Sequence, residues 1–159
     1  MATYDQTPGS TSQVGGTISA SGRVPYLVSQ NLNWATAATA AGATLASGDI
    51  IQLIDVPAHT MIIGVGAEVT TAANSTGNEV ISVTTSVSAT TWVQKQAGNS
   101  VGYMAEKATA ATFGGTPKRS TAADTIDVTL GSTGGTSPTS GEIRVFATLM
   151  SYDGFDGIN

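Results

Sequence analysis

The sequence predicts an all-β protein, an antiparallel β-sandwich of jelly-roll type with an extended N-terminal arm. The main observation is a period-two alternation of apolar and polar residues, which places one face of a strand in a core. In residues 124–130, Ile126, Val128 and Leu130 share one face, and residues 141–150 repeat the pattern. The second observation is composition. Only 11% of the residues are charged, against about 25% in an ordinary soluble domain, and small neutral Thr, Ala, Gly and Ser take their place.

Length and pattern divide the chain into three parts. The 159 residues suffice for one domain with a core of its own. Residues 1–22 are polar and lack a spaced apolar face, so we expect either a flexible tail or an arm that orders against a neighbouring subunit. Residues 23–150 form the predicted sandwich, and residues 151–159 form a short acidic tail.

Seven or eight strands are expected in the sandwich. The first covers residues 24–34, with Tyr26, Val28 and Leu32 on one face, and Pro25 favours an edge position for its beginning. The other predicted strands cover residues 49–56, 61–70, 79–87, 124–130 and 141–150, with short strands at 92–93 and 101–104. Turns at fairly regular intervals between such strands are typical of a sandwich. A jelly roll fits this length and closes most edges.

Other segments carry weaker signals. Residues 35–47 are rich in Ala, which favours helix, but repeated Thr and Gly42 oppose it, so we predict an extended segment or loop. Gly64 and Gly66 lie on one face of a predicted strand and indicate a bulge or the close approach of another backbone. One or two helical turns are expected in residues 105–112, and a solvated loop at 117–119.

Charge and composition exclude several classes of partner. The formal net charge is −5 and the pI is near 4.5, whereas a nucleic-acid binder needs clustered Lys and Arg to displace counterions. The chain has no cysteine, which excludes disulfides and thiolate metal sites. We expect no signal peptide, because no basic region precedes an apolar run. No apolar stretch is long enough to span a bilayer, so no membrane partner is expected.

Candidate catalytic groups are few. Asp124 and Asp127 are separated by an odd spacing, which sends them to opposite faces of a strand. Asp49 and Asp55 share a face by parity but lie roughly 20 Å apart, too far for a glycosidase pair. His59 is the only histidine, and nothing local orients it, so a solvated turn residue is expected.

Two glycine-containing motifs also fall short of a site. Residues 64–69 begin like a dinucleotide fingerprint but lack its third glycine. Residues 153–157 resemble a calcium loop but lack the third oxygen ligand and the distant bidentate Glu. We therefore expect no catalytic, cofactor-binding or metal-binding residues, and no enzyme.

Apolar and aromatic residues supply the candidate interface. The residues chosen are Val24, Pro25, Tyr26, Trp34 and Trp92. Core or interface packing is the usual fate of Trp. The alternative is a sugar-stacking platform formed by Trp34, Trp92 or Tyr103, which needs at least one of these rings exposed on a concave face.

Three segments carry a resemblance to a known family: TLASGDIIQLIDVPAHTMIIGVGAEVTTA (44–72), DTIDVTL (124–130) and GEIRVFATLM (141–150). They resemble the capsid decoration, or cement, proteins of tailed bacteriophages, which are jelly-roll sandwiches. The resemblance implies a virion protein on the outer surface of an icosahedral capsid, assembled in the host cytoplasm. It also implies binding between major capsid protein subunits and a homo-oligomer, often a trimer, with no catalytic residues.

Two alternatives to a decoration protein remain. One is another virion component, such as a tail or fibre part or the coat protein itself. The other is a carbohydrate-binding jelly-roll module. Composition favours a protein contact, because small residues let surfaces approach closely and few charges need to be desolvated on burial.

Overall fold

The computed structural model describes residues 3–5, 24–75, 80–85, 90–96, 100–104, 117–131 and 136–151. These ranges contain ten strands and one helix. The elements in chain order are β1 (Thr3–Asp5), β2 (Tyr26–Asn33), α1 (Trp34–Ala41), β3 (Ile50–Val56), β4 (Thr60–Thr71), β5 (Val80–Thr85), β6 (Thr90–Gln96), β7 (Gly102–Tyr103), β8 (Lys118–Ser120), β9 (Asp124–Gly131) and β10 (Glu142–Ser151). No helix in these ranges is long and apolar enough to cross a membrane.

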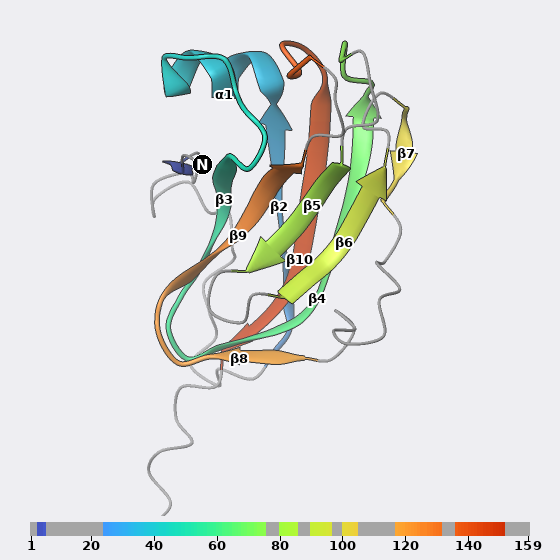
Figure 1. The fold of residues 1–159 in the computed structure, drawn as a ribbon. Coiled ribbons are helices and arrows are strands. Elements are labelled where there is room, and N and C mark those ends of the chain that lie inside the picture. Colours follow the sequence, from blue (N-terminus) through green and yellow to red (C-terminus); the bar gives the residue numbers. More distant parts are fainter. Residues whose placement is uncertain are drawn as a thin grey trace, which may run out of the picture.

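The strands form two sheets that lie face to face (Figure 1). Sheet A has the order β1-β3-β9-β5-β6, and sheet B has the order β2-β10-β4-β7, with β8 also paired to β4. Every pairing is antiparallel except the parallel pair of β1 and β3. The predicted all-β antiparallel sandwich is confirmed.

The chain crosses repeatedly between the sheets. Strands β2, β4 and β10 belong to sheet B, while β3, β5 and β9 belong to sheet A. Most pairings therefore join strands far apart in sequence, as a jelly roll also requires, and the jelly-roll type itself stays a prediction. The division into arm, sandwich and tail also stays a prediction, because residues 6–23 and 152–159 lie outside the described ranges.

Alternating side chains of both sheets build the core. In β9 the inward residues Ile126, Val128 and Leu130 are buried, and in β10 the buried set is Ile143, Val145, Ala147 and Leu149. Trp34 and Trp92 are the largest side chains that are fully buried. Each large apolar side chain buried in this way contributes roughly 1.5–3 kcal/mol.

The predicted strands match the observed ones within a few residues, with two omissions. Strand β1 lies inside the segment predicted as an arm. Strand β8 contains Lys118 and Arg119, so the solvated loop predicted there is wrong. Strand β4 is long enough to pair with two short strands. Its beginning, Thr60 to Ile62, pairs with β8, and Glu68 and Val69 near its end pair with β7. The predicted helical turns at residues 105–112 lie outside the described ranges.

Helix α1 replaces the extended segment predicted after residue 34. The Asn33 side-chain oxygen accepts hydrogen bonds from the backbone N–H groups of Ala35 (3.0 Å) and Thr36 (3.3 Å), which caps the first turn. Gly42 ends the helix at φ 63°, and its N–H donates to the Thr39 carbonyl. Trp34 and Ala37 are buried. Two caps and two buried anchors therefore outweigh the low helix propensity of Thr.

The two glycines of β4 have different roles. The register of β4 against β10 shifts by one residue next to Gly64. Thr148 pairs with Gly64, but the next residue, Leu149, pairs with Ile62. The predicted bulge is therefore present and adjoins Gly64. Gly66 lies opposite Phe146, and a Cβ on Gly66 would fall within the Phe146 ring, whereas a Cβ on Gly64 would meet nothing within 4 Å. The close approach at Gly66 is by a side chain and not by another backbone.

The Asn33 cap can be tested by substitution. Asn33→Ala removes the acceptor for two N–H groups of α1 and should lower the free energy of unfolding by about 0.5–2 kcal/mol. Chemical denaturation measures the change. Asn33→Asp keeps an acceptor oxygen and should retain most of the stability. Equal losses in both variants would contradict the assigned role.

The contact of Gly66 with Phe146 gives a second test. Gly66→Ala should destabilise the fold by about 0.5–1.5 kcal/mol, because the added methyl group overlaps the Phe146 ring and forces this outer-face side chain away from its preferred rotamer. Gly64→Ala is the matched control and should be nearly neutral. Combining Gly66→Ala with Phe146→Ala should recover part of the loss in a double-mutant cycle. Equal stability of the two single alanine variants would refute the packing described.

Candidate interaction surface

The acidic residues considered from the sequence do not converge. In the structure β3 shifts register against β9 between Gln52 and Ile54, so the predicted shared face of Asp49 and Asp55 is wrong. Asp49 is buried, and its carboxylate accepts a hydrogen bond from the Ala46 N–H at 2.7 Å. The Asp49 N–H donates to the Ala46 carbonyl, and the Leu130 N–H donates to the Asp49 carbonyl. Asp49 therefore closes a turn.

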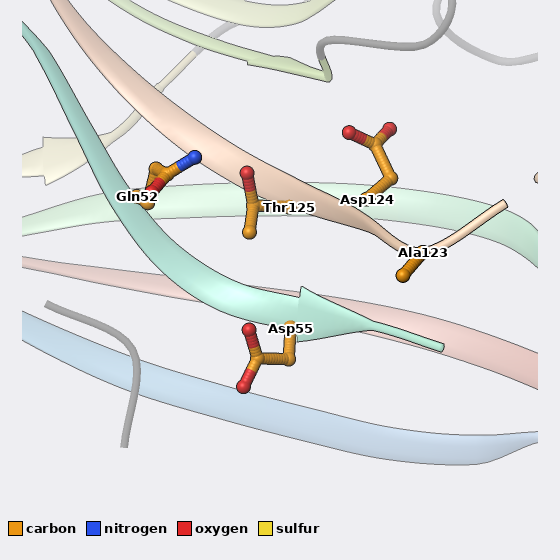
Figure 2. Close-up of a pocket in the computed structure, with 5 residues that line it drawn as sticks. All are labelled: Gln52, Asp55, Ala123, Asp124 and Thr125. Carbon is orange, nitrogen blue, oxygen red and sulfur yellow. The ribbon is translucent and has the colours of Figure 1, made fainter. Parts of the chain in front are cut away.

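A shallow depression of about 260 Å³ lies where β3 and β9 meet. Its lining is Gln52, Asp55, Ala123, Asp124 and Thr125. Figure 2 shows the carboxylates of Asp55 and Asp124 pointing to opposite sides of the two strands. Within the described ranges no group of three or more His, Cys, Asp or Glu residues is placed to hold a metal ion. The depression thus presents single carboxylates and no paired acid and base.

Asp127 is the most perturbed acid in the described part of the chain. Its neighbours Ile126 and Val128 point into the core, so Asp127 lies on the outer face of sheet A, opposite Gln52 of β3 and Thr84 of β5. The residue is only 4% exposed, and the Thr125 hydroxyl donates to its carboxylate at 2.6 Å. Burial raises the pKa of Asp127 to about 6; the Thr125 hydrogen bond lowers it, and the charge of Asp124 raises it further. The sequence analysis missed this environment, although the Thr-x-Asp spacing on one strand face signals it.

His59 lies in the turn between β3 and β4, as expected. It is half-buried and has φ 57°, the only positive φ among the described residues other than glycine. A tight turn in the left-handed region accounts for this conformation.

The candidate interface residues separate into two groups. Trp34 is 0% exposed and Trp92 is 2% exposed, so in this structure neither ring can contact a partner or a sugar. Val24 and Pro25 are exposed, and Tyr26 is half-buried at the start of β2. Tyr103 on β7 is 75% exposed and is the one candidate stacking ring found at the surface of the described residues.

The first surface of interest, which we call the β2 edge, comprises residues 24–33. Strand β2 is the last strand of sheet B. Its residues alternate, with Leu27, Ser29, Asn31 and Asn33 exposed and Leu32 buried. Val24 is 64% exposed and Leu27 is 66% exposed, so two of the four exposed large apolar residues in the described ranges lie here. The sequence analysis missed Leu27, although an apolar residue on the polar face of a strand is a signal of contact.

The second surface is the outer face of sheet B, which the strand registers arrange in rows. One row joins Asn31, Arg144 and Glu68; the next joins Ser29, Phe146 and Gly66; the third joins Leu27, Thr148 and Gly64. Met150 and Met61 pair beyond them. Rows two and three contain no charged residue, so the centre of this face is small, apolar and neutral.

Charged residues lie at two margins of this face: Arg144, Glu68 and Glu142 at one, and Arg119, paired with Met61, at the other. Arg144 forms an ion pair with Glu68 across β10 and β4. Glu142 accepts hydrogen bonds from Asn31 (3.1 Å) and Thr70 (3.3 Å) on the two flanking strands. A neutral centre with a polar margin is the anatomy of a protein–protein interface.

The raised pKa of Asp127 predicts a specific pH dependence. The folded protein holds this proton more tightly than the unfolded chain, so the stabilisation is complete below about pH 4. It is lost as the pH rises through about 6. Asp127→Asn cannot ionise and should be more stable than the wild type above pH 7 by about 1–2 kcal/mol, allowing for screening by water.

Urea denaturation between pH 4 and 8 measures this difference. Asp55→Asn, which also removes one negative charge from the neighbouring strand, is the control and should leave the slope unchanged. Parallel pH profiles of Asp127→Asn and the wild type would contradict the assignment.

Comparison with known proteins gives remote likenesses only. No family model matches the chain, and no curated protein matches it. The acidic stable capsid structure of Helicobacter pylori bacteriophage KHP30 is similar, with 12% identity and a TM-score of 0.49 over 80% of this chain and 87% of that one. The capsid of Ralstonia phage GP4 is similar with 11% identity and a TM-score of 0.44, over 80% of this chain and 84% of that one.

Proposed function

We propose that this protein is a virion structural protein that decorates and stabilises an icosahedral phage capsid by binding between major capsid protein subunits. The observation that carries the proposal is the outer face of sheet B. Its two central rows, from Ser29 to Gly64, are neutral, and at one margin Arg144 forms an ion pair with Glu68 within the chain. Such a face can be covered by another protein at a low cost in charge desolvation.

The shape of this face also suits a broad, flat partner. Gly64 and Gly66 leave the β4 backbone without side chains, and the Phe146 ring lies against Gly66. Phe146, Met61 and Met150 are half-buried, so they offer apolar surface that a partner can cover further. Aromatic and Met side chains are enriched at interface centres. Ser and Thr around them lose less side-chain entropy on burial than Lys or Glu.

The family resemblance supports the same role on separate grounds. Residues 44–72 contain β3, the His59 turn and β4, and the two shorter segments contain most of β9 and most of β10. These are central strands, which determine the sandwich. The resemblance therefore concerns the fold of the family, whereas the outer face of sheet B concerns the contact.

The remaining parts of the proposal follow from that resemblance. The protein acts on the outer surface of the capsid after assembly in the host cytoplasm. It binds the major capsid protein and further copies of itself, as a homotrimer, and uses neither nucleic acid nor membrane. Binding, without a chemical step or a cofactor, is its activity. Asp49, a buried acid with an assigned hydrogen bond, closes a turn of the fold.

A carbohydrate-binding module is the second candidate, because Tyr103 is 75% exposed. Tyr103 pairs with Glu68, so its ring lies beside the charged margin of sheet B. Sugar binding would quench or enhance the fluorescence of the chain on a glycan panel, and Tyr103→Ala would abolish the response.

Binding to capsids tests the first proposal. The open space above Gly64 predicts that Gly64→Lys folds normally but places a charged side chain in the centre of the face. We expect the wild type to co-sediment with capsids isolated without this protein, and Gly64→Lys to bind at least about tenfold more weakly. Ala123→Lys, at an exposed position beside β9, is the matched control and should bind like the wild type.

Two results would count against the proposal. Failure of the wild type to bind capsids would remove the decoration role. Equal binding of Gly64→Lys and Ala123→Lys would show that another surface makes the contact.

A further inference from the structure

Strand β2 differs from every other edge strand in the described part of the chain. It is eight residues long and carries no charge. Strand β1 has three residues, one of them Asp5; β6 includes Lys95; β7 has two residues; and β8 has three, including Lys118 and Arg119. Charges and short length are the usual means by which proteins prevent edge-to-edge pairing. Strand β2 lacks both.

The hydrogen-bonding groups of β2 on its open side can be assigned. The Trp34 N–H donates to the Gly141 carbonyl at 3.1 Å, in continuation of the unshifted register between β2 and β10. In an antiparallel pair, alternate residues direct both backbone groups to the partner strand. The even residues 26–32 therefore bond to β10. The N–H and C=O groups of Leu27, Ser29 and Asn31 face away from β10, where no described strand pairs with them.

We propose that two copies of this protein join through antiparallel pairing of β2 with β2, about a two-fold axis at Ser29. In this register Ser29 pairs with Ser29 of the second copy, and Leu27 pairs with Asn31 in both directions. All three outward-facing residues then form hydrogen-bonded pairs, and sheet B continues across the contact. Because the same surface is used by both copies, the contact is isologous.

A second copy fits this edge because the outward-facing backbone groups of Leu27, Ser29 and Asn31 are self-complementary about Ser29, and because the strand carries no charge. Each copy has a net charge of −5, so contact between copies is least costly where the surface carries no charge. The pairing also covers the apolar residues at this edge. Tyr26 comes opposite Leu32 of the second copy, and the exposed Val24 and Leu27 lie next to the junction. This two-fold contact is separate from the threefold contact that the family resemblance implies. It can form whether or not the protein is a trimer.

A single-cysteine variant tests the register, because the natural chain has no cysteine. In a hydrogen-bonded pair the two Ser29 Cα atoms lie about 5.5 Å apart, within disulfide range. Ser29→Cys should form a covalent dimer under mild oxidation of the full-length protein. Thr121→Cys, exposed and outside β2, is the control and should remain uncross-linked under the same conditions.

A proline variant tests the pairing itself. Ser29→Pro removes an N–H that faces away from β10, which an edge strand tolerates, so its denaturation midpoint should stay close to that of the wild type. Its assembly mass by native mass spectrometry should be half that of the wild type. Gln30→Pro removes an N–H that bonds to β10 and should instead unfold the protein.

Three outcomes would overturn the proposal. The first is an equal assembly mass for the wild type and Ser29→Pro. The second is the absence of a cross-linked Ser29→Cys dimer after oxidation. The third is a disulfide between Ser29→Cys and the coat protein when the oxidation is repeated on capsids. Equal masses with no cross-link would show that the edge is unpaired or is covered by this chain's own residues. A link to the coat protein would show that the shell supplies the strand. Capsid binding through the outer face of sheet B is measured separately with Gly64→Lys, so either proposal can fail without the other.

Discussion

The structure depends on strand β10, whose alternating side chains serve two surfaces at once. It lies between β2 and β4, with Ile143, Val145, Ala147 and Leu149 buried against sheet A. The residues between them point outward, where Arg144 pairs with Glu68 and Phe146 lies against Gly66. Because side chains alternate with a period of two, a register error of one residue would expose the core set and bury the outer set. The same alternation therefore specifies both the core and the proposed contact face.

The regular part of the fold follows from the sequence, and the exceptions have local causes. The alternation in β9 and β10 predicts both strands almost to the residue, and the pattern from Val24 to Trp34 predicts β2. Helix α1 was not predicted, because its stability comes from the Asn33 cap, the Gly42 cap and the burial of Trp34 and Ala37. Only tertiary packing supplies that burial. Strand β8 was not predicted, because it forms by pairing with the first residues of β4, Thr60 to Ile62, which are distant in sequence. The Asn33 and Gly42 caps are local sequence signals of a helix, whereas the burial of Trp34 and Ala37 and the pairing of β8 depend on tertiary structure.

The candidate site shows the same division. Val24 and Pro25 are exposed just before the edge strand β2 and Tyr26 begins it, so their role in an interface stays a prediction, whereas the two tryptophans chosen with them are buried. The sequence alone does not tell a core Trp from an interface Trp, because the large apolar ring packs well in both places. The outer face of sheet B was also beyond sequence, since it depends on the registers that bring Phe146 beside Gly66 and Leu27 beside Thr148. The low charge of the chain predicts surfaces that suit protein contact, and this stays a prediction.

The low content of charged residues bears both on the stability of the fold and on the proposed contact with the capsid. Neutral Thr125, Thr84 and Gln52 lie beside Asp127, the one acid of the described ranges with a clearly raised pKa. Neutral residues also occupy the centre of the outer face of sheet B. The most direct test of that account is a cryo-electron microscopy map of the intact particle at side-chain resolution. The account predicts Phe146 and Gly64 in contact with coat subunits, at positions between them. A map in which this face is open to solvent, or in which the protein is absent from the capsid, would contradict it.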